Sequence, residues 1–243
     1  MTLSVVIPAY EEAAGIQQTL LAVHGMWADH ADGVEIILVD DGSTDGTGDR
    51  ARDLGLSEVR VVQQPNRGKG AALQSGVAAS TGSIVYFVDA DLPYAVEDQK
   101  LLVETLQAGA KAAIGSRRHP ASVADAYPLA RRASSYALRR LVQVTLDVDS
   151  SDTQCGLKGF DGELARELFR RLRVPGFGFD LEILAALSAW DVPVVECPVH
   201  LTHERTSTVH LIRDSRRMLK DIRMIRRGMS EGRYAKPQML QTT

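Results

Sequence analysis

Residues 84–91, IVYFVDAD, decide the fold of this chain. The apolar run 84–88 has the length and the β-branched and aromatic content of a buried strand, and two aspartates follow it at once. The same order, an apolar run that ends in polar residues, occurs at 4–7 before Pro8-Ala9-Tyr10-Glu11 and at 35–39 before Asp40-Asp41-Gly42-Ser43. Each run predicts a strand that delivers polar side chains to one edge of a sheet.

Segments with helical periodicity separate these runs. The strand-like runs are 4–7, 35–39, 59–62, 84–88 and 112–114, and the helix-like segments are 14–23, 47–54, 71–79 and 99–106. Such an alternation predicts βαβ units with right-handed crossovers. We expect an α/β fold with a mostly parallel central sheet flanked by helices, and a ligand crevice at the carboxyl ends of the strands.

The second half of the chain loses this rhythm. We expect a long helix at 129–146, a polar loop at 147–159, a pair of helices and a strand-like stretch at 192–199. No Pro-rich or Ser-rich linker and no internal repeat separates the two halves, which predicts a single domain over 1–234. We expect residues 235–243 to be a frayed tail.

Composition bounds the classes of function. The 243 residues are 44% hydrophobic and 24% charged with a formal charge of -3, which argues against disorder and against a nucleic-acid partner. The two cysteines, Cys155 and Cys197, form neither a metal motif nor a disulfide framework. The sequence shows no signal peptide and no run of apolar residues long enough to span a membrane, so we expect a cytoplasmic protein.

The acidic loops suit a metal and a nucleotide. Asp89 and Asp91 can approach one divalent ion, and their hard oxygen ligands favour Mg²⁺ or Mn²⁺; the alternative is a capped turn after a strand. Asp40 and Asp41 can accept hydrogen bonds from a base or a ribose, although capping of a helix by Ser43, Thr44 or Asp45 is compatible with the same residues. The cationic, glycine-rich 66–70 (NRGKG) suits phosphate contacts or a plain glycine turn.

In combination, 6–12 (VIPAYEE), 39–45 (VDDGSTD), 66–70 and 89–91 (DAD) resemble glycosyltransferase family 2. The resemblance extends through 115–117 (GSR), 152–160 (DTQCGLKGF) and 178–182 (GFDLE) to the branch of dolichyl-phosphate mannose synthases and glucosyltransferases. It implies the Rossmann-like GT-A fold. It also implies a set of donor-binding residues: Pro8, Tyr10, Glu12, Asp40, Asp41, Lys69, Asp89, Ala90 and Gln154.

The resemblance also implies roles around the reacting groups. Asp89 and Asp91 would hold the metal. Arg117 and Arg131 would face the acceptor phosphate or the donor diphosphate. The catalytic set would be Asp91, Arg117 and Asp152. Asp180 and Glu182 would help to shape the sugar pocket. Mannose synthases often carry a glutamine where this chain has Pro93, and proline offers no side-chain ligand, so both a GDP-mannose and a UDP-glucose donor stay open.

The expected function is therefore metal-dependent, inverting transfer of a hexose from a nucleotide sugar to a polyprenyl or dolichyl phosphate. One alternative is a soluble family 2 enzyme that acts on a small metabolite, and a second is a non-catalytic nucleotide-binding protein. Residues 1–116 would bind the nucleotide sugar, 117–208 would form the acceptor half, and 209–229 would be a basic amphipathic helix.

Two interpretations of that helix remain open. Its apolar positions are Leu211, Met218, Ile222, Ile225 and Met229, and its basic positions are Arg213, Arg216, Arg217, Lys220, Arg223 and Arg227. The apolar stripe can pack on the domain and leave a solvated basic face, or the helix can bind an anionic membrane surface. Because a lipid acceptor requires contact with a membrane, we expect a peripheral protein or a small membrane-protein partner.

Overall fold

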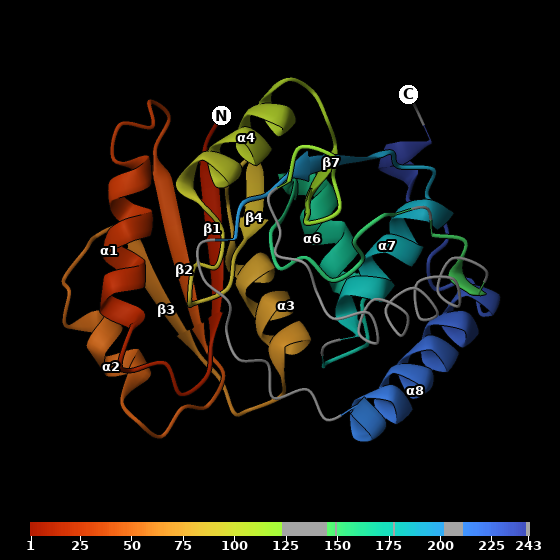
Figure 1. Ribbon diagram of the computed structural model, residues 1–243, viewed down its shortest axis with the longest axis horizontal. Helices are drawn as coiled ribbons and strands as arrows, with labels where there is room; N and C mark the ends of the chain where they lie inside the picture. The colour runs from red at the N-terminus through yellow and green to blue at the C-terminus, as the bar shows by residue number, and fades with distance from the viewer. Residues whose placement is uncertain (123–144, 149, 177, 202–210, 242–243) are drawn as a thin grey trace.

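The computed structural model (Figure 1) describes residues 1–122, 145–148, 150–176, 178–201 and 211–241, with backbone alone for 211–216. Its strands form a seven-stranded sheet in the order β3-β2-β1-β4-β6-β5-β7. The strands are β1 (Leu3–Ala9), β2 (Val34–Asp40), β3 (Val59–Gln63), β4 (Ile84–Phe87), β5 (Ala112–Ser116), β6 (Lys158–Asp161) and β7 (Val194–Pro198). The predicted α/β fold with a mostly parallel sheet is confirmed.

One strand runs against the others. β6 pairs antiparallel with both β4 and β5, whereas the β1–β2, β1–β4, β2–β3 and β5–β7 pairs are parallel. The prediction of a polar loop at 147–159 is wrong for Lys158 and Gly159, which belong to β6. Gly159 lies so close to the side chains of Leu102 and Tyr86 that an added Cβ would clash, which explains a glycine inside this strand.

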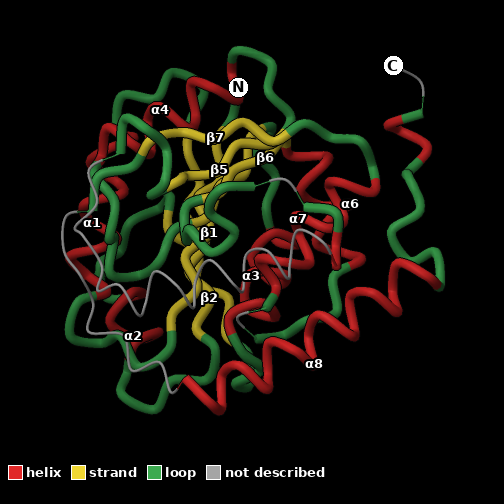
Figure 2. The backbone as a smooth tube through the Cα atoms, turned by 45° about the vertical axis from the view of Figure 1, so that its right-hand side comes forward, coloured by secondary structure: helices red, strands yellow, loops and turns green. Residues whose placement is uncertain are grey.

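The helices form two layers around the sheet. They are α1 (Ile16–Trp27), α2 (Thr47–Arg52), α3 (Lys69–Ala79), α4 (Val96–Gln107), α6 (Gly162–Arg171), α7 (Phe179–Ala189) and α8 (Leu211–Ser230). Alternate residues of each strand face opposite layers, so Val5 packs with α1 and α4 while Val6 packs with α3, α6 and α7. In Figures 1 and 2 the sheet lies between the two layers, with α8 outside α7.

Helix α8 packs its apolar face on the domain. Ile222 and Ile225 are buried in the same core as α6 and α7, and Met218 and Met229 pack against that core. The basic residues on the other side are exposed: Arg217, Lys220, Arg223, Arg226 and Arg227. Within the described residues, no helix is both long and apolar enough to cross a bilayer.

The segment after α8 is tied to the domain. Trp190 Nε1 donates to the carbonyl of Tyr234 at 3.0 Å, and Arg171 donates to the carbonyl of Ala235 at 2.7 Å. Lys236 pairs with Asp191, and a short 3₁₀ helix, η1 (Gln238–Leu240), follows. The expectation of a frayed tail from residue 235 is therefore wrong for residues 235–240. Of the predicted helix at 129–146, only residues 145 and 146 are described, and both are helical.

Candidate active site

The candidate site lies where the chain order of the sheet reverses. The chain passes from β1 outward to β2 and β3 and then returns to β4 on the other side of β1. Parallel strands whose connections leave in opposite directions open a crevice at their carboxyl ends. Hydrogen bonds and an ion pair join the loops after β1, β2, β3 and β4 at this edge of the sheet, as the sequence predicts.

Hydrogen bonds join the loops after β1 and β2. The backbone N–H groups of Glu11 and Glu12 donate to the hydroxyls of Ser43 and Thr47, at 3.0 and 2.9 Å. The Glu11 carboxylate in turn accepts the N–H of Thr44 at 2.8 Å. These bonds hold Glu11 at a φ of 56° and leave the Tyr10 side chain 51% exposed. Tyr10 can therefore contact a base, in the place where a donor-binding residue is predicted.

Asp40 and Asp41 are buried, and both organise nearby loops. Asp40 accepts the N–H of Ser43 at 2.9 Å and the amide of Gln63 at 3.2 Å. Asp41 accepts the N–H groups of Arg67 and Gly68 at 2.9 and 2.7 Å, so it fixes the loop after β3. Their donor-binding roles stay predictions.

The N-cap residue of α2 is Gly46 and has no side-chain cap, so the predicted capping by Ser43, Thr44 or Asp45 is wrong. Asp45 accepts the N–H of Thr47, the first residue of α2, at 3.0 Å and its hydroxyl at 2.6 Å. Asp45 therefore closes the turn that precedes α2.

The glycine-rich 66–70 forms a closed turn. The N–H of Gly70 donates to the carbonyl of Pro175 at 2.8 Å, and an added Cβ on Gly70 would lie 2.5 Å from the carbonyl of Val174. The backbone donors of Arg67, Gly68 and Gly70 are thus used inside the protein. The expectation of backbone contacts to phosphate is wrong for these groups, and the Lys69 side chain is the phosphate-binding candidate of this segment.

Asp89 and Asp91 stand at the end of β4 with Lys69 beside them. The Lys69 ammonium forms an ion pair with Asp89 Oδ1 and lies 5.7 Å from the ring centre of Phe179. An added Cβ on Gly156 would lie 2.6 Å from Asp89 Oδ2, so a side chain at position 156 would displace the Asp89 carboxylate. Burial by itself lowers the pKa of Lys69, but attraction by Asp89 and Asp180 outweighs it and raises that pKa above its usual value.

The two carboxylates fit a divalent ion that is completed by other ligands. They supply hard oxygen atoms on one short loop, and Lys69 already places a positive charge against Asp89. No group of three or more His, Cys, Asp or Glu side chains suited to a metal occurs among the residues that the structure describes. A metal here therefore needs oxygen atoms from a diphosphate or water.

A second lysine lies beneath this loop. Lys158 on β6 is fully buried, and its ammonium contacts Asp180 Oδ1 and the carbonyl of Cys155, both at 2.5 Å. Asp180 thus lies between Lys158 and the neighbourhood of Lys69, which supports its predicted place near the pocket. Lys158 was not predicted as a site residue, although a lysine inside an otherwise apolar run is a visible signal.

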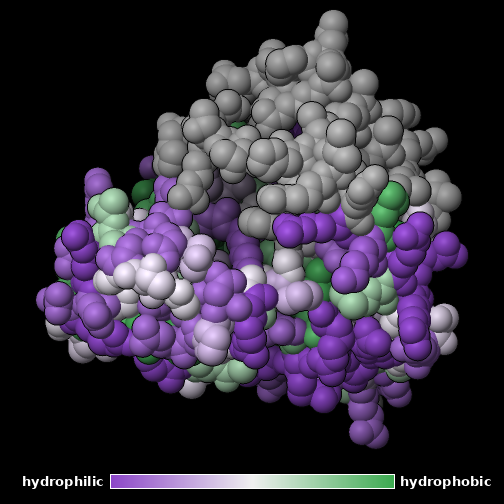
Figure 3. All heavy atoms as spheres, turned by 90° about the horizontal axis from the view of Figure 1, so that it is seen from below, coloured by the Kyte–Doolittle hydropathy of each residue, from purple (hydrophilic) through white to green (hydrophobic). Residues whose placement is uncertain are grey.

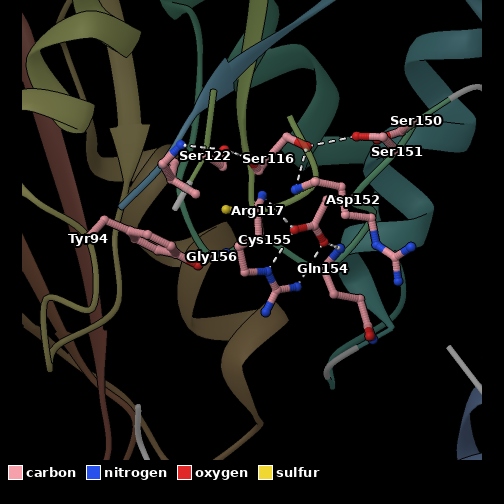
Figure 4. A network of polar contacts seen from close by, with 12 residues as sticks. Tyr94, Ser116, Arg117, Ser122, Ser150, Ser151, Asp152, Gln154, Cys155 and Gly156 are labelled. Carbon is pink, nitrogen blue, oxygen red and sulfur yellow. Dashed lines mark hydrogen bonds and ion pairs between the residues drawn. The ribbon is translucent and has the colours of Figure 1, made fainter. Parts of the chain in front are cut away.

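Arg117 and Asp152 form a fork at the end of β5. Arg117 donates through Nε to Asp152 Oδ2 at 2.6 Å and through Nη2 to Oδ1 at 2.8 Å, as Figure 4 shows. Burial alone raises the pKa of Asp152, but the bonds from Arg117 outweigh it and hold that pKa below its usual range. The fork uses two donor groups of Arg117, so the Nη1 group can still donate to a phosphate.

The loop that carries Asp152 is fixed on both sides of the fork. Before Asp152, the Ser151 N–H donates to Glu196 on β7 at 2.6 Å, and the Ser116 and Ser151 hydroxyls lie 2.7 Å apart. After it, the Gly156 N–H donates to the Tyr94 hydroxyl at 2.9 Å (Figure 4). Gln154, a donor-binding candidate, is exposed between these anchors.

The remaining predicted residues have different outcomes. Pro8 and Ala90 border the crevice at the ends of β1 and β4, while Arg131 lies outside the described residues. Glu182 is fully buried on α7, where it accepts the N–H of Val174 at 2.7 Å and the hydroxyl of Tyr234. Its carboxylate therefore fixes the 173–174 loop and Tyr234, and its predicted part in shaping the sugar pocket stays a prediction.

A histidine and a cysteine near the site are structural. His200 pairs with the buried Asp98 at 2.8 Å, and Cys155 is fully buried. Burial and the nearby Asp152 raise the pKa of the Cys155 thiol to about 11, so it stays protonated at neutral pH.

Fold and site together define a glycosyltransferase domain of the GT-A class, with a mostly parallel sheet and acidic loops at its switch point. The model of the family described as "Glycosyl transferase family 2" matches residues 4–169, and the chain belongs to that family.

Curated relatives align along most of the chain. The dolichyl-phosphate beta-glucosyltransferase of Saccharomyces cerevisiae is 31% identical over 96% of this chain and 76% of its own length. The protein of the same name from Dictyostelium discoideum is 30% identical over 92% of this chain and 73% of its own length. The polyprenol monophosphomannose synthase of Mycolicibacterium smegmatis is 30% identical over 82% of this chain and 76% of its own length.

Solved structures share the fold. Glucosyl-3-phosphoglycerate synthase of Mycobacterium tuberculosis, in complex with UDP, superimposes with a TM-score of 0.68 at 24% identity. The match covers 98% of this chain and 81% of that one. A complex of that enzyme with Mn²⁺, UDP and glucosyl-3-phosphoglycerate gives a TM-score of 0.67 at 24% identity, over 98% and 81% of the two chains.

Proposed function

We propose that this chain transfers a hexose from a nucleoside diphosphate sugar to the phosphate of a polyprenyl or dolichyl lipid, with inversion at the anomeric carbon. The observation that carries the proposal is the meeting of Asp89, Asp91 and Lys69 at the switch point, with Arg117 at the end of β5. The names of relatives that align over four fifths of the chain or more support the lipid phosphate as acceptor.

The donor lies in the crevice between the loops after β1, β2 and β4. Exposed Tyr10 supports the base, and the buried Asp40 holds Ser43 in the loop that would border the base or the ribose. Asp89 and Asp91 would hold Mg²⁺ or Mn²⁺, which supplies positive charge to the departing diphosphate. Lys69 adds a second positive charge to the same leaving group.

The acceptor needs orientation more than activation. A lipid phosphate is anionic at neutral pH, so no strong general base is required. Arg117, held by Asp152, presents its remaining donors to that phosphate from the side opposite the leaving group. A single displacement then forms the new bond to the anomeric carbon as the bond to the nucleoside diphosphate breaks, and this inverts the centre.

UDP-glucose is the donor that we expect. Pro93 provides no side-chain ligand near the two aspartates, and several relatives carry glucosyltransferase names. UDP together with Mn²⁺ in structural neighbours supports the same choice.

A membrane surface is the proposed meeting place of enzyme and acceptor. Helix α8 begins on the side of the molecule where the parallel strands end (Figure 1), and its exposed face carries Arg217, Lys220 and Arg223. Seen from that side, the described surface is largely hydrophilic (Figure 3). Because the apolar face of α8 is packed on the core, attachment would be electrostatic adsorption rather than insertion of the helix.

A donor and acceptor panel tests the function. UDP-glucose and GDP-mannose are each offered with polyprenyl phosphate or with phosphoglyceric acid, in Mg²⁺ or Mn²⁺, and the products are weighed by mass spectrometry. We expect hexosyl polyprenyl phosphate from UDP-glucose, and no product when the metal is chelated. A product on phosphoglyceric acid alone would establish the small-acceptor alternative, which the ligands of the structural neighbours support.

A further inference from the structure

The floor of the candidate site contains a nearly balanced set of charges. Three carboxylates, Asp89, Asp91 and Asp180, share this region with two ammonium groups, Lys69 and Lys158. Lys158 contacts Asp180 at 2.5 Å, and Lys69 is paired with Asp89, one of the two predicted metal ligands. With every group ionised, the set carries a net charge of -1, since three negative charges meet two positive ones.

We propose that Lys69 is an internal counter-ion for Asp89 that makes the divalent metal and the nucleoside diphosphate bind as a pair. The inference rests on the proposed function, since it takes the metal and the diphosphate as ligands of this site. In the absence of donor, Lys69 competes with the metal for Asp89. When metal and diphosphate arrive together, the diphosphate takes over the ammonium group.

The balance of charge explains why the metal and the diphosphate would bind as a pair. A divalent ion alone would change the net charge of the set from -1 to +1, and a diphosphate alone would make it strongly negative. Together the two ligands nearly cancel, so the set stays close to its original charge. In a partly buried site an uncompensated charge is costly, and each ligand therefore strengthens the binding of the other. Such coupling is reciprocal by thermodynamic necessity.

The position of Lys69 suits this exchange. Its side chain is 18% exposed and that of Asp89 is 31% exposed, so ligands from the crevice can reach both. Asp180 also attracts the ammonium, and the Phe179 ring lies 5.7 Å from it, so Lys69 keeps favourable neighbours after leaving Asp89. Asp180 cannot replace Asp89 fully, because Lys158 already occupies its Oδ1 atom.

Binding of Mn²⁺ and of UDP tests the proposal without any turnover. Free Mn²⁺ is measured by electron paramagnetic resonance with and without UDP, and UDP affinity is measured by calorimetry with and without Mn²⁺. The variants are Lys69→Met, Lys69→Arg and the control Lys111→Met. Lys111 pairs with Asp161 on the surface before β5, so its replacement changes the net charge equally but far from the site. Circular dichroism checks that each variant is folded.

We expect UDP to strengthen Mn²⁺ binding to the natural protein at least about tenfold. Lys69→Met should bind Mn²⁺ alone about tenfold more tightly than the natural protein, should bind UDP more weakly, and should lose most of the coupling. Lys69→Arg and Lys111→Met should keep the coupling.

Two results overturn the inference. If Lys69→Met leaves the Mn²⁺ affinity and the coupling unchanged while the natural protein binds Mn²⁺ with UDP, Lys69 is no competitor and the proposed function survives. If the natural protein binds no Mn²⁺ with UDP or with GDP, the proposed metal site fails, and the inference fails with it.

Discussion

Arg117 and Asp152 were both identified from sequence, whereas the ion pair between them was not. The GSR motif at the end of a strand marked the arginine, and Asp152 appeared as a separate catalytic candidate 35 residues later. Only the fold brings Arg117 Nε within 2.6 Å of Asp152 Oδ2. Single residues at strand ends are predictable because a strand ends where its apolar run ends. Residue pairs that join distant loops are not predictable in this way.

Replacing Arg117 by Lys tests its predicted acceptor role. Lysine keeps the charge but loses the planar fork, so it can neither bind both oxygens of Asp152 nor orient a phosphate equally well. We expect transfer to polyprenyl phosphate to fall about tenfold or more while hydrolysis of the donor by water changes little.

Both rates are measured on the same preparation, with Arg60→Lys on β3 as a control remote from the site. An equal fall of transfer and hydrolysis in Arg117→Lys would assign Arg117 to the donor instead.

At the scale of elements, segments with a clear apolar run or helical period were predicted well, whereas β6 was not. The helix predicted at 99–106 is α4 (Val96–Gln107), and the run at 84–88 is β4. β6 was missed because its four residues, KGFD, contain a lysine and a glycine. Their places are set by Asp180 and by the side chains of α4, which no local pattern shows.

Helix α8 illustrates how one pattern can serve two purposes. Its apolar stripe was predicted, but whether the stripe met the domain or a lipid was open. Burial of Ile222 and Ile225 assigns the stripe to the core. The basic face remains exposed at the same time, so packing on the domain and adsorption to anionic lipid do not compete for the same side chains.

Ile225→Ala measures what this packing contributes. The isoleucine is fully buried, so truncation should lower the free energy of unfolding by about 2–5 kcal/mol. Arg226 is the exposed neighbour of Ile225, so Arg226→Ala should change the free energy of unfolding by less than about 0.5 kcal/mol.

Urea unfolding followed by circular dichroism gives both values. Equal effects of the two substitutions would mean that α8 is held to the domain by something other than its apolar stripe.

At the scale of the whole molecule, the arrangement of layers was predictable because it follows from the alternation of strands and helices. The direction of β6 and the contacts of residues 235–240 were not, since both depend on segments far apart in sequence. The formal charge of -3 also conceals the basic face of α8. Association with a membrane therefore depends on where charge lies rather than on its sum.

Replacing Arg217, Lys220 and Arg223 together by Gln should weaken sedimentation with anionic vesicles at least about tenfold, because each cation near such a surface contributes about 1 kcal/mol. The loss should be largest at low salt, where screening is weakest. A second triple variant, Arg60, Lys100 and Lys111 to Gln, removes the same charge elsewhere and should sediment normally.

Neutral vesicles should bind neither the natural protein nor the variants. If the α8 variant sediments with anionic vesicles as well as the natural protein does, adsorption through this face is wrong, and a membrane-protein partner becomes the better explanation.

The position of β6 also constrains how the chain can be made. β4 finds one neighbour in β1, but its other edge stays unpaired until Lys158–Asp161 has left the ribosome, and β5 reaches the sheet only through β6. A nascent chain of 1–116 therefore presents an open, apolar edge, the kind of edge that pairs with other chains. A chain interrupted between β5 and β6 would therefore leave the second edge of β4 unpaired, and it is a candidate for aggregation or for rescue by a chaperone.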